Sequence, residues 1–101
     1  MELLIITAVQ SYEEDIKKLL KKHGVKVFSH MDVNGYKELQ EESREANWFA
    51  SDHNEHRSVL FYAFIGSQGV DEVLNAIDSF NKDQDTESHV HAVLLEVKKS
   101  I

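Results

Sequence analysis

The hydrophobic positions of the chain follow strand-like and helix-like patterns in the order βαββαβ. Apolar runs and alternations predict four strands, at residues 3–9, 25–33, 58–65 and 89–97. Spacings of three and four residues predict two amphipathic helices, with apolar stripes at Ile16, Leu19, Leu20 and His23, and at Val70, Val73, Leu74, Ile77 and Phe80. We therefore expect a ferredoxin-like α+β domain, in which two helices cover one face of a four-stranded antiparallel sheet.

Short polar motifs predict where these elements begin and end. Ser11 and Glu14 have the spacing of a capping box, in which each side chain bonds the backbone N–H of the other residue. We expect the first helix to begin there and to end at Gly24, which can adopt a left-handed conformation. The pair Asn34-Gly35 predicts the end of the second strand.

Three of the predicted strands carry large apolar side chains on both faces. Right-handed crossovers would place both helices on the same face, so the other face would expose an apolar patch. Soluble monomers rarely expose large patches of this kind, and we therefore expect a closed homo-oligomer that buries it. The alternative is that the C-terminal segment or the long loop folds back over the sheet.

A long polar insertion separates the second and third strands. Residues 37–57 contain six acidic and three basic side chains, and loops of this length in compact domains are usually functional or mobile. Trp48 and Phe49 are adjacent within it. Such an aromatic pair either packs on its own or a neighbouring subunit or contacts a partner protein.

Composition restricts the class of protein further. A chain of 101 residues forms one domain, residues 1–101, and its net charge of −7 argues against a nucleic-acid partner. The absence of cysteine excludes disulfides and thiolate metal sites. The N-terminal apolar run is too short to span a membrane and begins with an acidic residue, so we expect a cytoplasmic protein that does not insert into membranes.

Six histidines are present, and four of them are candidate metal ligands. His53 and His56 are three residues apart, a spacing that can bring both imidazoles to one side of a helical turn. His89 and His91 should project from one face of a strand. Together they are candidates for a divalent transition metal such as Zn²⁺, Ni²⁺, Co²⁺ or Cu²⁺. The alternative is that they are solvated residues of a loop tip and of a strand start.

Two other histidines have simpler interpretations. His30 beside Met31 offers a nitrogen and a thioether ligand, but a methionine on an alternating strand is expected in the core. His23 should contact the last carbonyls of the first helix. The sequence contains no cysteine nucleophile, no Gly-x-Ser-x-Gly elbow and no His-Glu-x-x-His motif, so we do not expect an enzyme. Acid–base catalysis by histidine and carboxylate is the least favoured alternative.

Four segments together carry a resemblance to a known family. They are Glu2-Leu3-Leu4-Ile5-Ile6, Lys22-His23-Gly24-Val25, Asp32-Val33-Asn34-Gly35-Tyr36 and the predicted second helix at 67–80. With them, nearly the whole chain resembles the PII-like family of trimeric signalling proteins. The resemblance implies a trimer whose sheets pack inward and a T-loop that opens near Tyr36 and touches effectors and targets. Tyr36 and Lys37 thereby join Trp48 and Phe49 as candidate ligand- or partner-binding residues.

The chain also departs from this family. Nucleotide-binding PII proteins have a Gly-rich basic loop after the second helix that cradles phosphates. Residues 81–88 here lack glycine and contain three acidic residues against one lysine, which argues against binding of ATP or ADP. The chain is more similar to divergent PII-like proteins, some of them associated with metal efflux or transport systems. The resemblance thus implies a regulator whose loop responds to a small ligand or metal ion and contacts a transporter or efflux protein; metal binding itself is the alternative function.

Overall fold

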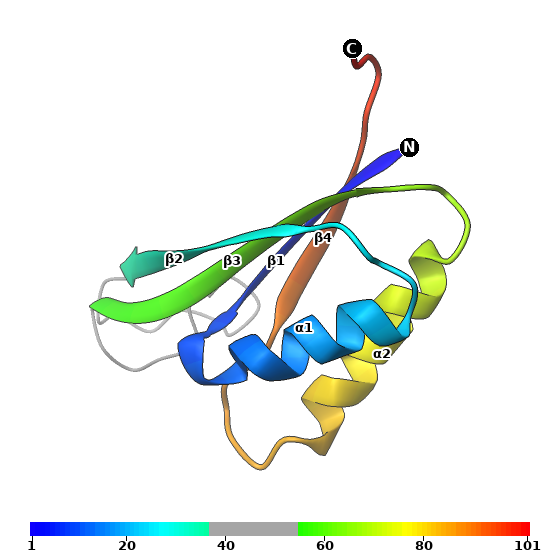
Figure 1. The fold of residues 1–101 in the computed structure, drawn as a ribbon. Coiled ribbons are helices and arrows are strands. Elements are labelled where there is room, and N and C mark those ends of the chain that lie inside the picture. Colours follow the sequence, from blue (N-terminus) through cyan, green and yellow to red (C-terminus); the bar gives the residue numbers. More distant parts are fainter. Residues whose placement is uncertain (37–54) are drawn as a thin grey trace.

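The computed structural model describes residues 1–36 and 55–101 of the chain. Its elements are β1 (Glu2–Val9), a 3₁₀ turn η1 (Gln10–Tyr12), α1 (Glu13–Lys22), β2 (Ser29–Tyr36), β3 (Glu55–Ile65), α2 (Val70–Asp83) and β4 (His91–Glu96). The strands form one antiparallel sheet in the order β2-β3-β1-β4. Both helices lie on the same side of this sheet (Figure 1), which confirms the predicted ferredoxin-like α+β fold.

The core lies between the sheet and the helices. Alternate residues of β1 and β3 supply its sheet side, and they are Leu4, Ile6, Ala8, Val59, Phe61 and Ala63. The helices supply Ile16, Leu20, Val73 and Ile77, all buried. Each large apolar side chain removed from water contributes about 1.5–3 kcal/mol, so this layer is the main source of the domain's stability. The predicted helical stripes and strand alternation are confirmed here.

The first helix begins differently from the prediction. A 3₁₀ turn precedes it, the N-cap position belongs to Tyr12, and no side chain caps the helix, so the predicted capping box of Ser11 and Glu14 is wrong. Tyr12 is buried instead. Its ring packs edge-on against Phe80 with centroids 5.2 Å apart, and its hydroxyl hydrogen-bonds Thr86 Oγ1 at 2.6 Å. Burial of an aromatic ring outweighs a cap of about 1 kcal/mol.

The end of α1 explains why the second strand begins late. Gly24 has a φ of +86°, as predicted, and its N–H bonds the Lys21 carbonyl at 3.2 Å. The Val25 N–H bonds the Leu20 carbonyl at 2.9 Å, which completes a Schellman motif with Val25 packed into the core. Because Val25 belongs to this helix end, the strand begins at Ser29, and the prediction of a start at residue 25 is wrong.

Three further strand ends differ from the predictions. The strand β3 begins at Glu55 rather than residue 58, which shortens the predicted insertion of residues 37–57. The strand β2 continues through Asn34 and Gly35 because this longer β3 pairs with it as far as Tyr36. The strand β4 begins at His91 rather than residue 89. Asn81 of α2 holds both backbone groups of Val90: its Nδ2 donates to the carbonyl at 2.9 Å and its Oδ1 accepts from the N–H at 2.7 Å. Asn81 thus supplies the hydrogen bonds that a neighbouring strand would otherwise give to the backbone of Val90.

The C-terminal segment does not cover the sheet. The Val97 N–H bonds the Met1 carbonyl at 3.2 Å, and beyond it the chain extends away from the sheet (Figure 1) to the fully exposed Ile101. This removes one of the two coverings that the sequence left open; the long loop lies outside the described residues. None of the helices in residues 1–36 and 55–101 has the length and hydropathy needed to cross a bilayer.

Candidate functional site

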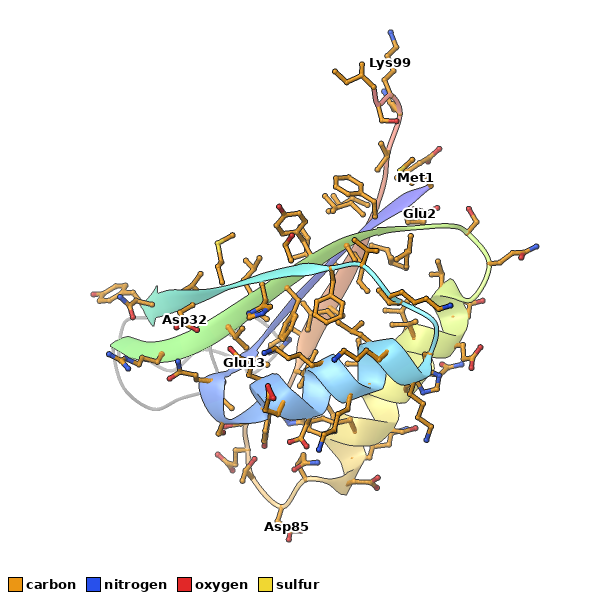
Figure 2. The ribbon with its side chains drawn as sticks, viewed as in Figure 1. Met1, Glu2, Glu13, Asp32, Asp85 and Lys99 are labelled. Carbon is orange, nitrogen blue, oxygen red and sulfur yellow. The ribbon has the colours of Figure 1, made fainter. Side chains whose placement is uncertain are left out.

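The sheet has a second face, opposite the helices, which we call the open face. Register defines it, because Leu3 of β1 pairs with Phe64 of β3 and Leu95 of β4. The same alternation places on it Leu3, Ile5, Thr7 and Val9 of β1, Met31 and Val33 of β2, Ser58, Leu60, Tyr62 and Phe64 of β3, and His91, Val93 and Leu95 of β4. Figure 2 shows aromatic and sulfur-bearing side chains rising from this face.

Most of the open face is apolar and accessible to solvent. Phe64 is 58% exposed, Met31 50% and Leu95 48%. Tyr62 and Phe64 form an edge-to-face pair with ring centroids 6.4 Å apart. Large apolar side chains gathered on one accessible surface are typical of a protein–protein interface. The prediction that the sheet is apolar on both faces is therefore confirmed.

One end of the open face is polar, and we call the group Thr7, Ser58 and His91 the polar end. Thr7 of β1 pairs with His91 of β4, and Ser58 of β3 pairs with Val9, two residues further along β1. Directly opposite side chains in a sheet have Cβ atoms about 5 Å apart, and diagonal ones are about 7–8 Å apart. The three polar side chains therefore project from neighbouring positions of one surface.

Ser58 is the unusual member of the polar end. Its side chain is 1% exposed, and its Oγ has no hydrogen-bond partner among the described residues. A buried hydroxyl without a partner costs about 1–3 kcal/mol, so a native protein seldom retains one without a reason. Ser58 lies three residues after Glu55, where β3 begins and the 37–54 segment ends. The hydroxyl can donate to or accept from a polar ligand at this point.

Sequence reasoning did not single out the polar end. The available signal was a polar residue in the open-face register of two otherwise apolar strands: Thr7 follows Leu3 and Ile5, and Ser58 precedes Leu60 and Tyr62. Of the predicted loop residues, Tyr36 is 60% exposed and pairs with Glu55. Lys37, Trp48 and Phe49 lie outside the described residues.

The four candidate metal ligands are only partly described. His53 lies outside the described residues, and His56 occupies the β3 position opposite Gly35. His89 is half-buried and precedes β4, whereas His91 begins this strand. Within residues 1–36 and 55–101 no three His, Asp, Glu or Cys side chains gather as a metal site. The histidine metal site stays a prediction.

The structure describes both remaining histidines. His30 pairs with Phe61 toward the helices, where its Nδ1 lies 4.0 Å from Glu13 Oε1, whereas Met31 pairs with Leu60 on the open face. The two therefore cannot share a ligand, and the prediction of a core position for Met31 is wrong. His23 is the C-cap of α1, and its backbone N–H bonds the Leu19 carbonyl at 3.1 Å, which confirms the predicted contact with the last carbonyls of the helix. Its Nδ1 also contacts Glu72 of α2 at 3.1 Å.

Two solved structures have folds similar to this chain. One is CPII, a nitrogen regulatory PII-like protein from Thiomonas intermedia K12 bound to ADP, AMP and bicarbonate, with 17% identity, a TM-score of 0.63, and coverage of 99% of this chain and 94% of CPII. The other is a DUF3240 family protein from Shewanella baltica OS155, with 15% identity, a TM-score of 0.67, and coverage of 98% and 91%. No protein-family model and no curated protein matches the sequence. The chain therefore has the PII-like fold that its sequence resembles.

Proposed function

We propose that this chain is a PII-like regulatory protein that assembles as a homotrimer through its open face. A small ligand binds at the polar end and changes how the 37–54 segment engages a target protein. The observation that carries this proposal is an accessible apolar sheet face that becomes polar where that segment joins the sheet. Its role is regulatory rather than enzymatic, and a transporter or efflux protein is the target that fits the sequence resemblance.

The chemistry of the open face supports assembly. Phe64, Met31 and Leu95 expose about half of their surface each, on three different strands. The helices already occupy the other face, and the C-terminal residues extend away from the sheet. Identical copies can bury the same patch on each other, as closed symmetric assemblies do. The PII-like fold supports a trimer among the closed forms.

The polar end supports ligand binding near the loop. Ser58 retains a buried hydroxyl without a partner, and a bound ligand would supply the missing hydrogen bond. Thr7 and His91 add a second hydroxyl and an imidazole at neighbouring positions. The CPII structure contains ADP, AMP and bicarbonate, which makes these three compounds the first ligands to test. Bicarbonate is the best match to residues 81–88, which lack the phosphate-cradling glycines.

The decisive variant removes the loop and leaves the sheet intact. Tyr36 and Glu55 are directly paired, so residues 37–54 can be replaced by Asn-Gly, a two-residue turn that closes an antiparallel hairpin. Light scattering should give the same trimeric mass for the intact chain and the hairpin variant. Isothermal titration calorimetry should detect bicarbonate or AMP binding to the intact chain and weaker or no binding to the variant.

Two results would contradict the proposal. A monomeric mass for the intact chain would remove assembly through the open face. Identical binding heats for the intact chain and the hairpin variant would remove the loop from the ligand response. A control variant with Ser79→Ala, at an exposed position of α2 on the helix side of the sheet, should behave as the intact chain does in both measurements.

A further inference from the structure

A cavity lies at the end of the sheet opposite the end of β2 and the start of β3. It is a cavity of about 300 Å³ between the end of α1, the end of β3 and the start of α2. Figure 1 shows these three segments meeting at the end of the sheet remote from the end of β2 and the start of β3. One water molecule takes about 30 Å³ of liquid, so the cavity holds about ten waters or one small metabolite. This size falls at the lower limit of small-molecule sites.

The side chains that line this cavity are basic or uncharged. The protein carries eighteen acidic residues and a net charge of −7, yet none of the described residues that line the cavity is acidic. The polar side chains in the lining are His23, Lys26 and Gln68, and of these Lys26 and Gln68 have N–H groups to donate to a ligand. The remaining wall is largely apolar and includes Val25, Ile65 and Val73.

Lys26 is available to a ligand. It is exposed and has no ion-pair partner among the described residues, in contrast to Lys17, which contacts Glu14 at 3.1 Å and Glu13 at 3.4 Å. The hydrogen bond with Glu14, followed by the one with Glu13, raises the pKa of Lys17. An ammonium group without such partners is free to pair with an anion that enters the cavity.

His23 is held in position at the cavity wall. Its Nδ1 lies 3.1 Å from Glu72 Oε1 of α2, and its side chain is 20% exposed. A carboxylate at one ring nitrogen fixes the orientation of the imidazole and makes that nitrogen the donor. The Glu72 contact therefore ties the end of α1 to the start of α2, the two helix ends that enclose the cavity.

We propose that this cavity binds a small organic carboxylate with an apolar body. The anionic group pairs with Lys26 and accepts a hydrogen bond from the side-chain amide of Gln68, while the apolar body contacts Val25, Ile65 and Val73. The site is separate from the polar end, because it lies at the ends of strands where β1 begins and β3 finishes. The cavity is thus a second ligand-binding site of the domain, in addition to the one proposed at the polar end.

Benzoate is a suitable probe, since it combines one carboxylate with one apolar ring. Three of the four glycines, Gly24, Gly66 and Gly69, line the cavity, and the fourth, Gly35, pairs with His56 near the loop. In a ¹H–¹⁵N spectrum of the full chain, benzoate should shift the first three amide signals along one saturating curve and leave Gly35 unmoved. Benzamide, the uncharged analogue, should bind more weakly.

Variants test the roles of charge and space separately. Lys26→Gln should weaken benzoate binding about threefold, the size expected of one exposed charge pair, while Lys18→Gln on α1, outside the lining, should not. Gly66→Leu should weaken binding because Gly66 lines the cavity and a leucine side chain there competes with the ligand for space. An added Cβ at Gly66 meets no atom within 4 Å, and its φ is not in the left-handed range, so the variant should fold.

Several outcomes would overturn this proposal. They are the absence of saturable shifts at the three cavity glycines with millimolar benzoate, equal binding of benzamide, and an unchanged affinity in Lys26→Gln. The last two do not depend on whether Gly66→Leu folds. Shifts at Gly35 alone would assign benzoate to the loop end instead and would leave the proposed regulatory function standing while removing the cavity site.

Discussion

Replacing Phe64 by glutamate should dissociate the assembled protein into folded monomers. Phe64 is 58% exposed in the single chain. On the open face it pairs with Leu3 of β1 and packs against Tyr62, two residues earlier on β3. A phenylalanine contributes about 200 Å² of surface, so assembly would bury about 115 Å² more of it. At about 25 cal/mol per Å², this burial is worth about 3 kcal/mol per protomer.

The expected shift in affinity follows from this figure. Loss of about 3 kcal/mol raises a dissociation constant about 100-fold, and a buried unpaired carboxylate adds several kcal/mol more. Light scattering over a dilution series should therefore show monomers of Phe64→Glu at concentrations where the intact chain remains assembled. Circular dichroism should show an intact fold, because the side chain is outside the helix-side core.

A matched control separates the effect of the position on the open face from the effect of introducing a glutamate. Val27 is 82% exposed and apolar but lies before β2 and outside the sheet, so Val27→Glu should keep the assembled mass. Equal masses for Phe64→Glu and the intact chain at every dilution would refute the reasoning, as would dissociation of Val27→Glu to the same extent.

Three further predictions address the hydrogen bonds between Asn81 and Val90, the polar end and the histidines. Asn81→Ala removes both side-chain hydrogen bonds to Val90 and should lower the free energy of unfolding by about 1–3 kcal/mol in urea titrations. Asn75→Ala, at an exposed position of the same helix, should change it by less than about 0.5 kcal/mol. Equal changes in the two variants would show that the Asn81 hydrogen bonds do not stabilise the fold. Ser58→Ala should leave stability unchanged or higher and weaken bicarbonate binding in calorimetry, and a clear loss of stability would show that the hydroxyl is already satisfied. Zn²⁺ titration should give saturable heat that is lost in a chain with both His53→Ala and His56→Ala, and identical heats in the two chains would exclude these ligands.

Local patterns predicted the fold well because they encode burial directly. The alternation of Leu4, Ile6 and Ala8 places these residues in the core, and the spacing of Ile16 and Leu20 does the same for α1. Element ends were predicted less well. The strand at residue 25 and the capping box at Ser11 are local preferences of about 1 kcal/mol, and larger tertiary contacts overrode both.

The candidate sites were harder to find in the sequence. The loop and the apolar open face follow from length and alternation, but the polar end depends on register, since only pairing brings Thr7 opposite His91. The cavity depends on a contact between distant helix ends, made by His23 and Glu72, which are 49 residues apart. No sequence neighbour of His23 identifies it as part of the cavity wall, and Glu72 contacts His23 without lining the cavity itself.

The sequence alone determined the order of elements and the two-sided apolar character of the sheet, because hydrophobic periodicity records which side of each element leaves water. Only the tertiary structure decided where the strands end, that Asn81 holds the start of β4, and that a donor-lined cavity forms around Lys26. These features depend on backbone hydrogen bonds and side-chain contacts between residues far apart in the chain, for which local periodicity carries no information.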